Sequence, residues 1–124
     1  MGAKVLAIDD DAAQRKVYET LFRFWGYEIH TAKNGAEGLA MASELRPDLI
    51  LTDVMMPDMD GYSMLMNLKA KPEMADIPVI VLTGQRGERY ETVSKGFGAI
   101  YHVNKPFDPP ELEAKVKEIL GKRK

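Results

Sequence analysis

The sequence has 124 residues, enough for one globular domain, and 45% of them are hydrophobic, which suffices for a buried core. It contains no cysteine, so disulfides, thiol catalysis and cysteine-bound metals are excluded, and we expect a protein of a reducing, cytoplasmic compartment. No apolar run approaches the ~18 residues that a membrane-spanning helix needs, and a net charge of -2 argues against a basic nucleic-acid-binding face.

The N-terminal segment predicts a buried strand followed by an amphipathic helix. The strand covers the apolar run at residues 4–8 and ends at three consecutive aspartates. Asp11 can cap the following helix, and Gly26 ends it. One face of this helix should be buried, and its apolar spacing assigns to that face Val17, Leu21, Phe24 and Trp25.

Four further strands alternate with helices along the rest of the chain. The strands are predicted at residues 27–32, 48–52, 79–82 and 99–104, and the helices at residues 34–46, 62–70, 86–95 and 108–120. The last helix starts at Asp108 and should bury Leu112, Val116, Ile119 and Leu120. Five strands alternating with five helices predict a single α/β domain over residues 1–124, a doubly wound parallel sheet with helices on both faces.

Chemically active side chains follow four of the five predicted strands. They are Asp9, Asp10 and Asp11 after the first strand, Asp53 after the third, Thr83 after the fourth and Lys105 after the fifth. Open parallel sheets bind their ligands at this carboxyl edge. Neighbouring carboxylates repel each other unless a cation is present, and Mg²⁺ prefers one or two carboxylates together with phosphate oxygens. With a hydroxyl and an ammonium nearby, the set predicts phosphoryl transfer, in which Asp53 can be the nucleophile.

Four short motifs occur in order at these strand ends. They are Ile-Asp-Asp-Asp at residues 8–11, Leu-Thr-Asp-Val-Met-Met-Pro-Asp-Met-Asp-Gly at 51–61, Val-Leu-Thr-Gly at 81–84 and Asn-Lys-Pro-Phe at 104–107. From Lys4 to about Leu120 the chain resembles the receiver domain of two-component response regulators, in a form like the single-domain chemotaxis regulators. The resemblance implies a flavodoxin-like sheet with strand order 2-1-3-4-5 and a cis peptide bond before Pro106.

The resemblance also implies a phosphorylation-dependent signalling switch. Asp53 would accept a phosphoryl group from a phosphohistidine on a sensor kinase or phosphotransfer protein, and Thr83 and Lys105 would contact the phosphoryl oxygens. Mg²⁺ would be held by Asp10, Asp53 and the backbone carbonyl of Met55, with Asp9 acting largely through water. The domain would catalyse only its own phosphorylation and dephosphorylation.

An output surface is implied as well, at the predicted helix 86–95, the strand 99–104 and the last helix. Its members would include Arg89, Tyr90, Lys95, Tyr101 and His102. His102 stands three residues before Lys105, where the family usually has a rotating Tyr or Phe, so we expect His102 and Thr83 to form the switch. An output protein, or an effector domain outside this sequence, would read that surface.

Two other functions fit part of the pattern. Asp9 and Asp11 have the D-x-D spacing of haloacid-dehalogenase-type phosphatases, but that function leaves Asp53 and the loop at residues 57–61 unexplained. A receiver-like interaction module that is never phosphorylated would leave the acids, Thr83 and Lys105 without a role.

Overall fold

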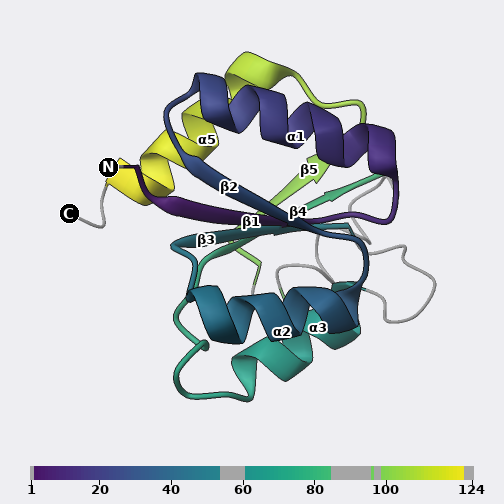
Figure 1. The fold of residues 1–124 in the computed structure, drawn as a ribbon, viewed down its shortest axis with the longest axis vertical. Coiled ribbons are helices and arrows are strands. Elements are labelled where there is room, and N and C mark those ends of the chain that lie inside the picture. Colours follow the sequence, from purple (N-terminus) through teal and green to yellow (C-terminus); the bar gives the residue numbers. More distant parts are fainter. Residues whose placement is uncertain (1, 54–60, 85–95, 97–98, 122–124) are drawn as a thin grey trace.

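A computed structural model describes residues 2–53, 61–84, 96 and 99–121 (Figure 1). The elements in chain order are β1 (Lys4–Ile8), α1 (Ala12–Phe24), β2 (Glu28–Ala32), α2 (Gly35–Leu45), β3 (Leu49–Thr52), α3 (Gly61–Lys69), β4 (Val79–Thr83), β5 (Tyr101–Asn104) and α5 (Pro109–Gly121). The strands form one parallel sheet in the order β2-β1-β3-β4-β5. The predicted α/β fold and strand order are therefore confirmed, while the predicted helix at residues 86–95 lies outside the described residues.

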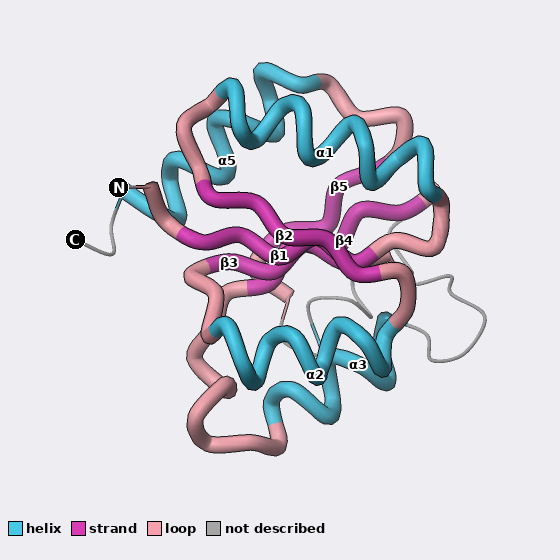
Figure 2. The backbone as a smooth tube through the Cα atoms, in the orientation of Figure 1, coloured by secondary structure: helices cyan, strands magenta, loops and turns pink. Residues whose placement is uncertain are grey.

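The sheet lies between two helical layers. Helices α1 and α5 cover one face, and α2 and α3 cover the other (Figures 1 and 2). Because helices cover both faces of the sheet, both faces of the central strands are buried. This explains why those strands read as continuous apolar runs.

Within the described ranges, no helix is both long enough and apolar enough to span a bilayer.

Alternate residues of each central strand enter two separate hydrophobic cores. In β1, Leu6 and Ile8 pack with α2 and α3, whereas Val5 and Ala7 pack with α1 and α5. This is the two-residue period of a pleated strand. We call these the α2/α3 core and the α1/α5 core. The four predicted buried residues of α5 all lie in the α1/α5 core.

The buried face of α1 differs from the prediction. Tyr18 and Phe22 are almost fully buried, whereas Val17 is 42% exposed and Phe24 is 85% exposed. The prediction is wrong for Val17 and Phe24 because two stripes of similar apolar spacing run along this helix. Packing decides between them, since the Phe22 ring meets Trp25 edge-on with the ring centroids 4.9 Å apart.

Two predicted helix starts are confirmed by their caps. The Asp11 side chain accepts a hydrogen bond from the Ala13 N–H at 2.9 Å, and the Asn34 side chain accepts one from the Glu37 N–H at 2.8 Å. Each bond satisfies an amide that the first helical turn leaves without a backbone partner. The cap at Asp11 fixes the start of α1 directly beside the end of β1.

Candidate functional site

Asp9 and Asp53 follow the two adjacent central strands β1 and β3. The strands pair with Ile8 opposite Thr52, and the Asp53 N–H donates to the Ile8 carbonyl at 3.1 Å. Both acids are buried, with 1% of Asp9 and 9% of Asp53 exposed. Since the chain leaves β1 for β2 on one side and enters β3 on the other, this is the point of the sheet where ligands of doubly wound folds bind.

Lys105 links these two carboxylates. Its Nζ lies 2.6 Å from Oδ2 of Asp9 and 2.8 Å from Oδ2 of Asp53. The lysine follows Asn104 at the end of β5 and precedes Pro106 across a cis peptide bond, as predicted. Residues from the ends of three strands, distant in sequence, therefore converge at one edge of the sheet.

The charges of this cluster do not cancel. Burial disfavours the Lys105 ammonium, but its hydrogen bonds to Asp53 and Asp9 outweigh burial and raise its pKa above the ordinary value. The ammonium therefore stays charged at neutral pH, and it offsets only one of the two buried carboxylates. An exposed third acid, Asp10, lies next to Asp9 in the chain.

The donor chemistry suits Mg²⁺. Asp9 and Asp53 provide buried carboxylate oxygens and excess negative charge, and Mg²⁺ is commonly held by one or two carboxylates while keeping several waters. Among the described residues, no group of three or more Asp, Glu, His or Cys side chains gathers to hold a metal. A closed cage of protein ligands, of the kind that structural zinc needs, is thus not formed by that part of the chain.

Asp9 has further partners from the loop and from α1. Its Oδ1 accepts a hydrogen bond from the Asp11 N–H at 3.0 Å, and its backbone carbonyl accepts one from Arg15 Nη1 at 2.7 Å. The Tyr18 hydroxyl lies 3.5 Å from Asp9 Oδ2. Sequence reasoning missed Arg15 and Tyr18. Both residues lie in the first two turns of a helix that begins beside Asp9, and this position could have indicated them. Tyr18 was missed because the predicted buried face of the helix did not include it.

The remaining predicted site residues are distributed as follows. Thr83 ends β4 and is paired in register with Asn104, and His102 is half-buried on β5 in register with Val81. Asp11 serves as the cap of α1. Met55, Arg89, Tyr90 and Lys95 lie outside the described residues.

Tyr101, the neighbour of His102, is engaged with α5. Its hydroxyl donates to Glu118 at 2.5 Å, and Lys115 Nζ lies 5.5 Å from the centre of its ring. Tyr101 and Val103 pack against the α1/α5 core. His102 is therefore on the opposite face of β5, because successive side chains of a strand alternate.

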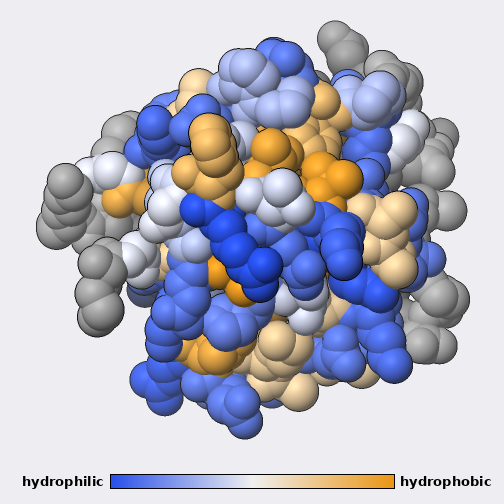
Figure 3. Space-filling view, turned by 45° about the horizontal axis from the view of Figure 1, so that its top comes forward, coloured by the Kyte–Doolittle hydropathy of each residue, from blue (hydrophilic) through white to orange (hydrophobic). Residues whose placement is uncertain are grey.

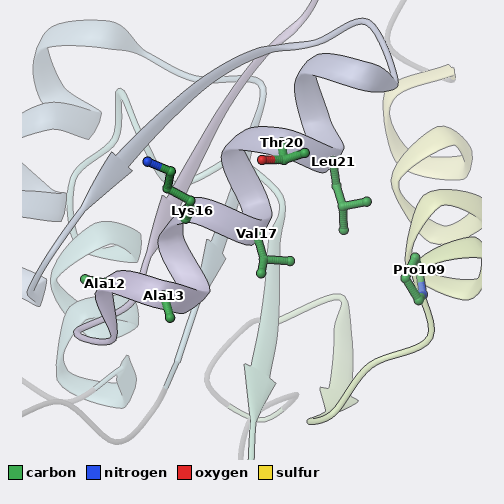
Figure 4. Close-up of a pocket in the computed structure, with 7 residues that line it drawn as sticks. All are labelled: Ala12, Ala13, Lys16, Val17, Thr20, Leu21 and Pro109. Atoms are coloured by element: carbon green, nitrogen blue, oxygen red, sulfur yellow. The ribbon is translucent and has the colours of Figure 1, made fainter.

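An apolar pocket of about 680 Å³ lies near this site without including the acids. Figure 4 shows its lining from α1 and the start of α5, namely Ala12, Ala13, Lys16, Val17, Thr20, Leu21 and Pro109. This lining contains no carboxylate. In the space-filling view, the face that carries α1 and α5 is mostly hydrophilic with scattered apolar patches (Figure 3). The pocket therefore lacks the chemistry of the acid pair, and the candidate site remains the edge at Asp9, Asp53 and Lys105.

A family model for the response regulator receiver domain matches residues 5–117. The chain belongs to this family. The probable transcriptional regulator ycf27 of Porphyra purpurea is 40% identical over 118 residues, which cover 94% of this chain and 47% of that protein. This receiver domain therefore spans about half the length of the curated relatives that it matches.

Solved structures show the same fold. The chemotaxis protein CheY4 of Vibrio cholerae has a TM-score of 0.90 and 32% identity, covering 96% of this receiver domain and 99% of that chain. The signal receiver domain of a signal transduction histidine kinase from Syntrophus aciditrophicus has a TM-score of 0.89 and 34% identity, covering 97% and 91%. The resemblance found in the sequence is thereby confirmed. Because the chain belongs to the receiver-domain family, we do not retain the haloacid-dehalogenase-type phosphatase as an alternative function.

Proposed function

We propose that this receiver domain is a phosphorylation-dependent signalling switch with Asp53 as its phosphoacceptor. The observation that carries the proposal is the contact of Lys105 Nζ with Asp53 Oδ2 at 2.8 Å, at the ligand-binding edge of the sheet. Asp53 is a buried carboxylate beside a fixed ammonium, so a nucleophile and a donor for developing negative charge lie together.

In the proposed reaction, a carboxylate oxygen of Asp53 attacks the phosphorus of a phosphohistidine. The new O–P bond forms as the N–P bond breaks, and the released imidazole nitrogen takes a proton from solvent. The product is an acyl phosphate on Asp53, which water later hydrolyses. Lys105 would pair with the phosphoryl oxygens, and we assign the same task to the Thr83 hydroxyl from the family resemblance.

We assign Mg²⁺ to the same edge. Asp10, Asp53 and the backbone carbonyl of Met55 would hold it directly and Asp9 largely through water, and when bound it would neutralise charge on the phosphoryl oxygens. The support from this chain is the excess negative charge at Asp9 and Asp53 described above.

The partners follow from the same chemistry. The phosphoryl donor would be a phosphohistidine on a sensor kinase or phosphotransfer protein. We assign residues 1–124 to one receiver domain, whose output surface would comprise the segment between β4 and β5, β5 itself and α5, with Thr83 and His102 as the switch pair. Relatives named as transcriptional regulators are about twice as long, which supports an output domain or partner elsewhere.

The test is direct phosphorylation. The protein is incubated with acetyl phosphate and Mg²⁺, and its intact mass is measured. We expect one added phosphoryl group on the wild type and none on Asp53→Asn. Asp76→Asn is the matched control, because Asp76 is an exposed acid near the start of β4, at the opposite end of the sheet, and it should be labelled like the wild type. Equal labelling of Asp53→Asn would overturn the proposal, and so would no labelling of the wild type, which would leave an interaction module.

A further inference from the structure

A buried tyrosine of α1 reaches the phosphorylation site from the α1/α5 core. Tyr18 is only 1% exposed, and its hydroxyl lies 3.5 Å from Oδ2 of Asp9. The rest of the side chain packs in the α1/α5 core, so a phenylalanine could fill the same space. A tyrosine here therefore adds one polar group, and that group faces a carboxylate that we propose helps to hold Mg²⁺.

The Tyr18 hydroxyl is a hydrogen-bond donor at neutral pH, since a phenol loses its proton only at about pH 10. Because the phenol keeps its proton and the Asp9 carboxylate can only accept, the hydrogen bond has one direction. A donor of this kind orients a carboxylate and disperses its charge.

Asp9 Oδ2 has two described side-chain donors, Lys105 at 2.6 Å and Tyr18 at 3.5 Å. In the proposed reaction, Lys105 also pairs with the phosphoryl oxygens, so its three N–H donors are shared between those oxygens and the carboxylates. The buried Tyr18 hydroxyl has no such second task in that reaction. It can therefore hold Asp9 in place throughout the cycle.

The ring of Tyr18 makes a second connection. It stacks on Phe107 with a centroid separation of 6.0 Å and an angle of 17° between the ring planes. Phe107 is two residues after Lys105 in the chain. One side chain thus contacts both the Asp9 carboxylate and the segment that carries Lys105.

We propose that Tyr18 is a positioning residue of this site, which holds the Asp9 carboxylate in the orientation that binds Mg²⁺. The inference deepens the proposed function and rests on it. Outer-shell hydrogen bonds to metal ligands commonly contribute a factor of roughly ten or more to metal affinity, so loss of the hydroxyl should weaken Mg²⁺ binding on the order of tenfold.

The test uses Tyr18→Phe, which removes the hydroxyl and keeps the ring. The dissociation constant of Mg²⁺ alone is measured on the full chain by titration of amide NMR signals, and a thermal unfolding curve verifies folding. Tyr27→Phe is the matched control, because Tyr27 packs on Phe22 in the same core away from the acids. We expect roughly tenfold weaker binding for Tyr18→Phe and no change for Tyr27→Phe. Unchanged Mg²⁺ binding in Tyr18→Phe would overturn the inference.

A double-mutant cycle separates positioning from a merely structural effect. If Tyr18 acts through Asp9, then Tyr18→Phe should lower Mg²⁺ affinity in the wild-type background but not in Asp9→Asn. An equal loss in both backgrounds would refute positioning through Asp9. A wild type that binds Mg²⁺ and shows this coupling, but takes no phosphoryl group, would overturn the proposed function and leave the role of Tyr18 in Mg²⁺ binding intact. A wild type that does not bind Mg²⁺ would overturn the inference.

Discussion

Lys105 lies 96 positions after Asp9 in the chain, yet its Nζ is 2.6 Å from Asp9 Oδ2. The same atom is 2.8 Å from Asp53 Oδ2, so one ammonium joins the ends of β1, β3 and β5. The three side chains are largely or fully buried. This arrangement stabilises the edge of the sheet and leaves these three side chains with a net negative charge.

Replacing Lys105 should reveal the electrostatic repulsion between the Asp9 and Asp53 carboxylates. Lys105→Met leaves two buried carboxylates without their shared cation, so the free energy of unfolding in chelator at neutral pH should fall by about 3 kcal/mol. Added Mg²⁺ should then stabilise the variant more than the wild type. Urea denaturation with chelator and with Mg²⁺ measures both effects.

Lys117→Met is the control for this experiment. Lys117 pairs with Glu113 at 3.1 Å on the surface of α5, where its side chain is 62% exposed. Exposed pairs of this kind contribute about 0.5 kcal/mol or less. A Lys105→Met protein as stable in chelator as Lys117→Met would contradict the electrostatic account.

The same ion pairs should depend on pH in a defined direction. The ordinary pKa of lysine is 10.5, and although burial lowers that of Lys105, its bonds to Asp53 and Asp9 raise it overall. Since the pKa of the folded state exceeds that of the unfolded state, this contribution is fully present below the unfolded value and is lost as pH rises through the folded one. In chelator, the stability difference between wild type and Lys105→Met should stay constant from about pH 7 to about pH 10 and shrink above that. If this stability difference already declines between about pH 7 and about pH 9, the pKa of Lys105 is not raised by the two carboxylates.

Two phenylalanines of α1 test the observed orientation of that helix. Phe22 is fully buried and Phe24 is 85% exposed. Phe22→Ala should therefore cost about 3 to 5 kcal/mol of unfolding free energy, because it leaves a cavity in the α1/α5 core. Phe24→Ala should change stability by no more than about 0.5 kcal/mol. Chemical denaturation of both variants gives the comparison, and similar losses would mean that the helix is rotated from its observed position.

The close packing of α2 on β1 predicts the effect of an added methyl group at Gly38. A Cβ at this position would lie 2.4 Å from Cδ1 and 2.9 Å from Cγ1 of the buried Ile8. The clash with Ile8 should outweigh the helix preference of alanine, which is about 1 kcal/mol. Gly38→Ala should therefore lower the free energy of unfolding by about 1 to 2 kcal/mol. Gly121 in α5 has nothing within 4 Å of such a Cβ, and Gly121→Ala should be neutral or gain up to about 1 kcal/mol. Thermal unfolding of Gly38→Ala and Gly121→Ala measures both effects on stability. A Gly38→Ala protein as stable as the wild type would disprove the close contact with Ile8.

Most of the fold was predictable because local signals agreed with one another. The apolar strands, the cap at Asp11, the helix start at residue 34 and the buried stripe of α5 each follow from neighbouring residues, and the structure has them. The meeting of Asp9, Asp53 and Lys105 was predictable as well, since the carboxyl ends of parallel strands lie at one edge.

The contribution of Tyr18 was not predictable, because it depends on the rotation of α1. The helix carries apolar residues on two stripes, and hydrophobicity alone does not decide which stripe is buried. Contacts that form only in the folded state settle it, such as the packing of Phe22 on Trp25 and of Tyr18 on Phe107. Sequence patterns of a single helix do not contain that information.

The most direct test of the central claim locates the phosphoryl group on the chain. The protein is phosphorylated with acetyl phosphate and Mg²⁺ and then reduced with borohydride, which converts an aspartyl phosphate into homoserine. Peptide mass spectrometry then identifies the reduced residue. We expect homoserine at residue 53 and at no other aspartate. Homoserine at residue 9, 10 or 11 instead, or at no position, would contradict it.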